Sequence, residues 1–95
     1  MFKVSSLISK DIITYPELRA LKGKYTLTDS QMADITGDKA YQTFKRKLDC
    51  ESEFSGSDMV NIVNYFQKLG EDTSVKKIFF DWIFSIEEFL IHRPA

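Results

Sequence analysis

The side chains with the clearest capacity for chemistry lie between residues 39 and 48. Apolar residues recur there at the spacing of one buried helix face: Ala40, Phe44 and Leu48. At about 100° per residue, the opposite face and its flanks carry an amide, a hydroxyl and three cations. These side chains belong to Lys39, Gln42, Thr43, Lys45 and Arg46. Guanidinium and amide groups can pair with base edges in a DNA major groove, and ammonium groups can pair with phosphates. The pattern therefore favours nucleic-acid recognition.

Two neighbouring charges have expected structural roles. Lys47 falls near the edge of the buried face, where its stem can lie along the surface while its amine reaches solvent. Asp38 is the predicted N-cap of a helix from about Lys39 to Leu48. The alternative for the basic face as a whole is an ordinary solvated helix surface.

Two helices with clear start and stop signals precede this segment. Pro16 suits the first turn of a helix that closes near Gly23. Thr28 and Gln31 have the spacing of a capping box, which predicts the start of a second helix, and Gly37 can adopt the left-handed conformation that ends it. Its inward face should consist of Met32, Ala33 and Ile35.

Further helices are expected on both sides. An apolar stripe favours a short leading helix: Val4, Leu7, Ile8 and Ile12. Ser57 and Asp58 predict the start of a helix that ends near Gly70 and buries Met59, Ile62, Val63 and Phe66. Thr73 or Ser74 can cap a last helix, which opens with Val75, Ile78 and Phe79. The chain is therefore predicted to be an all-α domain of five to six helices.

Composition narrows the possible functions. The chain has 95 residues, the size of one domain, and a formal net charge of −1, so contact with a polyanion must come from a local patch. The single cysteine, Cys50, and the single histidine, His92, exclude an internal disulfide, a Cys/His zinc site and a paired Cys-His or Ser-His nucleophile. The acids lack the spacing of catalytic pairs or metal ligands. We expect no enzyme activity and no cofactor.

The hydrophobic runs are too short for export or membrane insertion. Asp11 follows the N-terminus before an apolar stretch long enough for a signal peptide develops. The run from Ile78 to Ile91 is interrupted by acids and falls short of the roughly 20 apolar residues that span a bilayer. With a lone cysteine, a reducing cytoplasm is the expected location.

Several motifs, taken in order, resemble one known family. They are Tyr15-Pro16-Glu17-Leu18-Arg19, Leu27 to Gly37, Phe44 to Leu48, Ser52-Glu53-Phe54 and Ile78-Phe79-Phe80. In this order they resemble the phage Cro/C1-type helix-turn-helix domain, the family of the lambdoid repressors. The resemblance implies a lambda-repressor-like domain over residues 15–80, an N-terminal extension over 1–14 and an apolar C-terminal tail over 81–95.

The resemblance also implies that the partner is double-stranded DNA. It assigns base reading to Tyr41, Gln42 and Arg46, with Lys39 and Lys45 as further base or phosphate contacts. The chain departs from the family pattern because the turn after the second helix is one residue longer. It also has three acids where phosphates would lie: Asp29, Asp49 and Glu51. Each like-charge contact there could cost on the order of a few kcal/mol.

The C-terminal segment holds more large apolar residues than one face of a helix can bury. We expect a dimer contact that includes Trp82, Ile83, Ile86, Phe89 and Leu90. The alternative is that this segment folds back over the core together with Phe2, Val4 and Leu7. In a dimer, two reading helices about 34 Å apart would match a pseudo-palindromic operator.

These observations predict a homodimeric, sequence-specific transcriptional regulator of a phage or another mobile element. The main alternative is an interaction protein that keeps the fold with weakened DNA reading, such as an antirepressor or a phage-encoded inhibitor of a host protein, a CRISPR nuclease included. A third possibility is an antitoxin, which would use the same helices on DNA and its apolar tail on a toxin. The operator sequence, and the choice between repression and activation, stay open.

Overall fold

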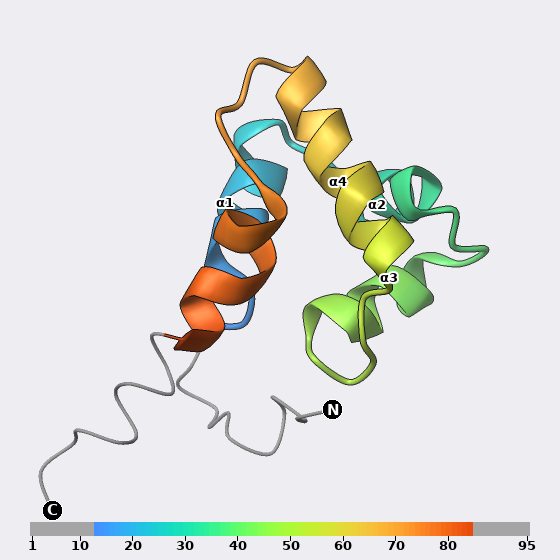
Figure 1. The fold of residues 1–95 in the computed structure, drawn as a ribbon. Coiled ribbons are helices and arrows are strands. Elements are labelled where there is room, and N and C mark those ends of the chain that lie inside the picture. The colour runs from blue at the N-terminus through green and yellow to red at the C-terminus, as the bar shows by residue number, and fades with distance from the viewer. Residues whose placement is uncertain (1–12, 85–95) are drawn as a thin grey trace, which may run out of the picture.

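Helices are the only regular elements between residues 13 and 84, the part of the chain that the computed structural model describes (Figure 1). In order they are α1 (Pro16–Lys24), α2 (Asp29–Thr36), α3 (Tyr41–Leu48), α4 (Gly56–Lys68) and the π-helix η2 (Lys76–Phe80). Helical backbone continues from η2 through residue 84. The predicted all-α class is confirmed for this part of the chain, and the expected leading helix near residues 4–12 lies outside it.

The predicted boundaries of α1 and α2 are confirmed. Pro16 occupies the first turn of α1. Thr28 Oγ1 accepts a hydrogen bond from Gln31 N at 3.1 Å, and Gln31 Oε1 accepts one from Thr28 N at 2.8 Å, which completes the capping box of α2. Gly37 ends α2 in the left-handed region, with a φ of 78°. These signals are local, because every partner lies within one helical turn.

The predicted starts of α3 and α4 were wrong by a few residues. Asp38 does not cap α3; Ala40 precedes the helix in extended backbone, with φ −138° and ψ 145°, and supplies no side-chain cap. The cap of α4 is Ser55 and not Ser57. Ser55 Oγ accepts from Asp58 N at 3.1 Å, and Asp58 Oδ2 accepts from Ser55 N at 3.0 Å. Asp58 therefore completes a capping box at the third position of α4.

The last helix begins as predicted but contains a wider turn. Ser74 Oγ accepts a hydrogen bond from Lys77 N at 3.2 Å. Asp81 N donates to Lys76 O, an i to i+5 bond of the kind that defines a π-helix. Apolar spacing did not indicate this widening. The segment buries three side chains against the rest of the domain: Ile78, Phe79 and Trp82.

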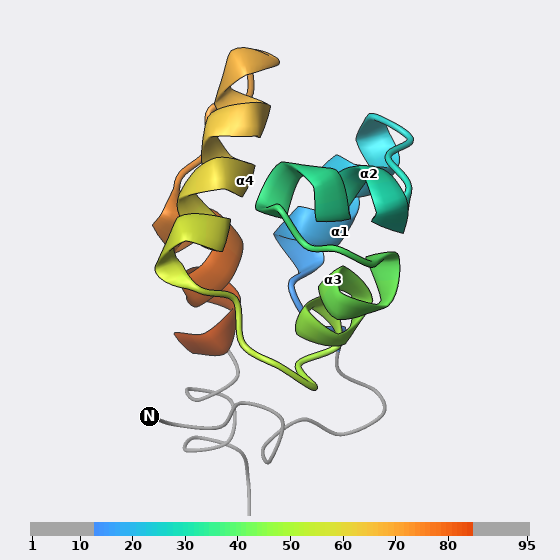
Figure 2. The same ribbon diagram turned by 90° about the vertical axis from the view of Figure 1, so that its right-hand side faces the viewer.

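The helices pack around one core. α2 contacts both α3 and α4, while α1 lies beside η2, as both views show (Figures 1 and 2). Fully buried side chains come from every helix: Leu18, Met32, Phe44, Ile62, Phe66 and Ile78. Tyr15 lies among three other rings, with centroid distances of 5.1 Å to Phe54, 5.9 Å to Phe79 and 4.8 Å to Trp82. Their edge-to-face geometry joins the start of α1 to the last helix.

Candidate nucleic-acid interface

A tight turn and two apolar anchors hold α3 against the core. Asp38 N donates to Ala33 O at 2.9 Å, which satisfies one of the last carbonyls of α2. Phe44 and Leu48 are buried on the inner side of α3. Ala40, which was expected to share that inner side, is exposed because it precedes the first helical residue. The buried face of α3 is therefore shorter than predicted.

The outer side of α3 and the turn before it expose all of the side chains that helical spacing or the family resemblance proposed for DNA contact. They are Lys39, Tyr41, Gln42, Thr43, Lys45 and Arg46. Tyr41 is 51% exposed at the first turn of the helix. All six side chains are exposed to solvent on α3 or in the turn before it, and we call them together the α3 outer face.

Three cations of the α3 outer face have no carboxylate partner among residues 13–84: Lys39, Lys45 and Arg46. Every other cation in this range except Lys68 forms an ion pair. These paired residues are Arg19, Lys22, Lys24, Lys47, Lys76 and Lys77. The positive charge that is available to an anionic ligand is therefore concentrated on α3, although the whole chain carries a net charge of −1.

Two of the three acids expected near phosphates are already paired. Arg19 Nη2 lies 2.9 Å from Asp49 Oδ1, and Lys22 Nζ lies 3.2 Å from Asp29 Oδ1. Glu51 is exposed and has no ion pair within residues 13–84. Pairing lowers the repulsion that Asp29 and Asp49 would exert on a phosphate, so among these three acids only Glu51 opposes an anionic ligand with its full charge.

An open hollow of about 550 Å³ separates α3 from the C-terminal half of α1. Its charged lining consists of Arg19, Lys22, Asp29, Lys45 and Asp49. Four of these residues form the two ion pairs just described. Lys45, which belongs to the α3 outer face, is therefore the charged residue of this hollow that forms no ion pair within residues 13–84.

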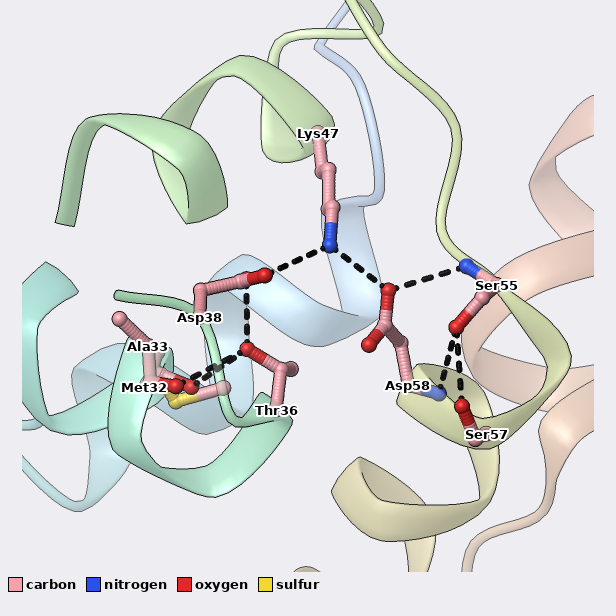
Figure 3. A network of polar contacts seen from close by, with 8 residues as sticks. All are labelled: Met32, Ala33, Thr36, Asp38, Lys47, Ser55, Ser57 and Asp58. Atoms are coloured by element: carbon pink, nitrogen blue, oxygen red, sulfur yellow. Dashed lines mark hydrogen bonds and ion pairs between the residues drawn. The ribbon is translucent and has the colours of Figure 1, made fainter. Parts of the chain in front are cut away.

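Lys47 does not reach solvent as predicted (Figure 3). Its Nζ lies 2.9 Å from Asp38 Oδ1 and 2.8 Å from Asp58 Oδ2, and its side chain is 13% exposed. Asp38 Oδ2 also accepts a hydrogen bond from Thr36 Oγ1 at 2.7 Å. The two carboxylates draw the amine inward, and we call this group the Asp38–Lys47–Asp58 network.

The network changes the pKa values of two of its members. Burial alone would raise the pKa of Asp58, but hydrogen bonds from Lys47 and Ser55 outweigh burial and hold the pKa below its ordinary value. Burial would lower the pKa of Lys47, but the hydrogen bonds to Asp58 and Asp38 outweigh it and raise the pKa. Both groups are therefore charged at neutral pH.

The pKa of Asp58 predicts acid sensitivity. Because its folded-state pKa is depressed, its contribution to stability is present above the ordinary value of 3.8 and is lost as pH falls through the folded value. We expect the free energy of unfolding, measured by urea titrations at a series of pH values, to fall in this range. Asp58→Asn should flatten that part of the curve, and an unchanged slope in this variant would contradict the assignment.

The C-terminal end of α3 is braced by residues near the start of α1. Thr14 Oγ1 donates to Leu48 O at 2.6 Å, and Arg19 Nη2 donates to Thr14 Oγ1 at 2.8 Å. Cys50, just after α3, adopts a left-handed φ of 62°, and burial raises the pKa of its thiol. No sequence pattern indicates this brace, because its partners are far apart along the chain and their residue types are common on surfaces.

Of the five residues expected at a dimer contact, the structure describes two, and both pack against the core of their own chain. Trp82 is 8% exposed and lies in the core of its own chain, and Ile83 is partly buried against that core. Ile86, Phe89 and Leu90 lie outside the described residues. Up to residue 84, where the described part of the chain ends, the large apolar side chains that the last helix exposes are Phe80 and Phe84, which are four residues apart.

Comparisons with known proteins identify no relative. No protein-family model matches the chain, and no curated protein or solved structure matches it. Within residues 13–84, no group of three or more His, Cys, Asp or Glu residues has the arrangement of a metal site. No helix in the same range combines the length and the apolar character that crossing a membrane requires.

Proposed function

We propose that this protein is a sequence-specific DNA-binding transcriptional regulator that inserts α3 into the major groove of a double-stranded operator. The observation that carries the proposal is the cluster of unpaired cations, Lys39, Lys45 and Arg46, beside the exposed amide of Gln42. The α2 and α3 helices, joined at Gly37, support a helix-turn-helix within a lambda-repressor-like fold. No cofactor is part of the proposal.

The chemistry of the α3 outer face suggests a role for each side chain. The guanidinium of Arg46 can donate two hydrogen bonds to guanine, and the amide of Gln42 can pair with adenine. Lys45 lies at the hollow beside α1 and suits a phosphate, and so does Lys39 in the turn. Tyr41 and Thr43 would then complete the contact with base edges or the sugar-phosphate backbone.

We further propose that the protein binds as a homodimer on a pseudo-palindrome. The low net charge favours this arrangement, because a second copy doubles the number of cations that meet the operator. The contact would involve the C-terminal part of the chain, where Phe80 and Phe84 expose apolar surface. The expression of a regulated gene would change as the dimer occludes or recruits polymerase.

Selection of bound sequences from a random duplex pool tests the proposal. At about 100 mM salt, the wild type should enrich a pseudo-palindrome. Arg46→Ala should weaken binding to that operator by about 1–3 kcal/mol and relax the preference at one base position of each half-site. The physical reason is that the lost guanidinium contacts a base edge and not only the backbone.

Lys45→Ala is the matched control on the same helix. It should weaken binding to all duplexes alike and flatten the dependence of affinity on salt, because its partner is a phosphate. Equal and sequence-independent losses from Arg46→Ala and Lys45→Ala would contradict base reading by Arg46.

One observation favours a second candidate function. Phe80 and Phe84 expose apolar surface on a chain whose net charge is −1, which suits a protein partner better than a polyanion. If the random pool yields no enriched sequence, we expect an interaction protein instead, such as an antirepressor, an inhibitor of a host protein or an antitoxin. Phe84→Asp should then abolish capture of the partner in a pull-down.

A further inference from the structure

We propose that Lys47 is a positioning residue for DNA reading, which fixes the orientation of α3 through the Asp38–Lys47–Asp58 network without touching DNA. This inference rests on the proposed function, because it concerns how the α3 outer face is presented to a duplex. It assigns a role to the one cation of α3 that the interface itself leaves unused.

The network joins three separate elements around a single ammonium group (Figure 3). Asp38 lies in the turn between α2 and α3, Lys47 lies in the last turn of α3, and Asp58 lies in the first turn of α4. The two N–O distances are 2.9 Å and 2.8 Å. Both carboxylates have second attachments: Asp38 accepts from Thr36, and Asp58 accepts from Ser55 N. The amine is therefore tied to atoms that are themselves fixed.

The packing of α3 makes such a tie consequential. Its buried side chains, Phe44 and Leu48, are four residues apart and form a single apolar line. A small rotation of a helix about its axis costs little apolar contact when its buried side chains form one line, and the other attachment of α3, from Thr14 Oγ1 to Leu48 O, is confined to its C-terminal end. Lys47 projects about 100° away from Leu48 and adds a directional attachment that opposes this rotation. Its neighbour Arg46 would move with any rotation that Lys47 fails to prevent.

Exposure separates this role from phosphate binding. The side chain of Lys47 is 13% exposed, and those of Asp38 and Asp58 are 11% and 7% exposed. None of the three can add much to the attraction between the protein and an arbitrary duplex, which depends on exposed cations. Base reading, in contrast, tolerates misplacement of only about 0.5 Å or 10–20°. Loss of the network should therefore reduce discrimination between sequences and spare non-specific affinity.

The test compares two affinities for each variant. Wild type, Lys47→Met and Lys45→Met are titrated with the selected operator and with a scrambled duplex of the same composition, at a temperature where circular dichroism shows each protein fully folded. For Lys47→Met, the ratio of the two affinities should fall by about tenfold, while affinity for the scrambled duplex stays within about twofold of wild type. For Lys45→Met, both affinities should fall and the ratio should hold.

A second pair of variants covers the case in which Lys47→Met does not fold. Asp38→Ala removes one anchor of Lys47 and should lower the ratio. Asp38→Asn should restore it, because the Asn oxygen can still accept from Lys47. The Asn amide can donate to Thr36 Oγ1. The Thr36 hydroxyl can then donate its own hydrogen to Ala33 O, which lies 3.1 Å away. A role limited to stability would leave the ratio unchanged in every folded variant.

Two outcomes distinguish this inference from the proposed function. A wild type that discriminates, together with Lys47→Met and Asp38→Ala variants that discriminate equally well, would overturn the positioning role and leave the proposed function intact. A wild type that binds both duplexes with equal affinity would overturn the proposed function and this inference with it.

Discussion

Replacement of Lys47 by methionine is expected to lower the free energy of unfolding by about 3 kcal/mol. Methionine keeps the apolar stem and a similar helix propensity, so the change isolates the charge. The carboxylates of Asp38 and Asp58, which are 11% and 7% exposed, would then lack their common cation. An unpaired carboxylate with so little access to water is costly, because solvation cannot replace the lost partner. Urea unfolding at pH 7, followed by circular dichroism, measures the loss.

Lys45→Met is the control for this prediction. Lys45 is exposed on the same helix and has no carboxylate partner among residues 13–84, so its loss should change stability by less than about 0.5 kcal/mol. The double variant Lys47→Met/Asp58→Asn should lose less than the sum of the two single variants, because the second change removes a stranded charge. Similar stabilities for Lys47→Met and Lys45→Met would show that the network contributes little.

Local signals predicted the start of α1 and both ends of α2, where the interacting groups lie within one turn, but they placed the start of α4 at Ser57 although the capping box of Ser55 and Asp58 is equally local. The capping box of Thr28 and Gln31 and the left-handed Gly37 follow from residue types at fixed offsets. The buried residues of α4 could be predicted for the same reason: Ile62, Val63 and Phe66 recur at helical spacing. Where a local rule had no competitor, residue type and spacing were sufficient.

Distant partners explain the wrong predictions for Asp38 and Lys47. Asp38 is a good N-cap by type, but its carboxylate instead meets Thr36 and Lys47, and Ala40 precedes α3 without a capping side chain. An acid near a helix start can cap it or form an ion pair, and the sequence does not show which cation folding brings close. The inward amine of Lys47 depends on Asp58 in the same way, because that acid belongs to another helix.

The candidate site was predictable in its exposure but not in its charge balance. Helical periodicity is enough to turn Gln42, Lys45 and Arg46 away from Phe44, and the structure exposes all three. The pairing of Asp49 with Arg19 joins residues 30 positions apart, so no motif could indicate it. The structure therefore changes the electrostatic argument, because paired acids oppose a phosphate less than free ones do. Whether this face reads DNA stays a prediction.

Trp82 illustrates the limit of composition as a guide. An excess of large apolar residues near the C-terminus indicates that some of them must contact another surface, but it does not say which ones. Ile78, Phe79 and Trp82 meet the core together at the i, i+1, i+4 spacing of one helix face, and in the described part of this helix the exposed rings are those of Phe80 and Phe84. Helical spacing sorts these residues into two faces but does not say which face meets the core, and the π-helical turn itself has no simple sequence signal.

Trp82→Ala is expected to destabilise the monomer by about 3–5 kcal/mol, a large fraction of the stability of a small domain. The indole is 8% exposed, and its ring centroid lies 4.8 Å from that of Tyr15. Its removal would leave a cavity next to Tyr15, which also contacts Phe54 and Phe79. Urea unfolding at a fixed protein concentration, combined with sedimentation, measures stability and oligomeric state together.

Two further variants decide whether lost packing in the core causes the expected destabilisation of Trp82→Ala. Tyr41→Ala removes an aromatic ring that is 51% exposed and should lose less than about 1 kcal/mol. Trp82→Phe keeps an aromatic ring in the cluster and removes Nε1, a buried donor with no acceptor among residues 13–84, so it should lose much less than Trp82→Ala. If Trp82→Ala instead keeps the stability of the wild type and only converts a dimer to a monomer, the indole belongs to a subunit contact. Loss of folding stability in Trp82→Ala, with Tyr41→Ala unaffected, would show that the aromatic core extends to the last helix and that any dimer contact must use other side chains.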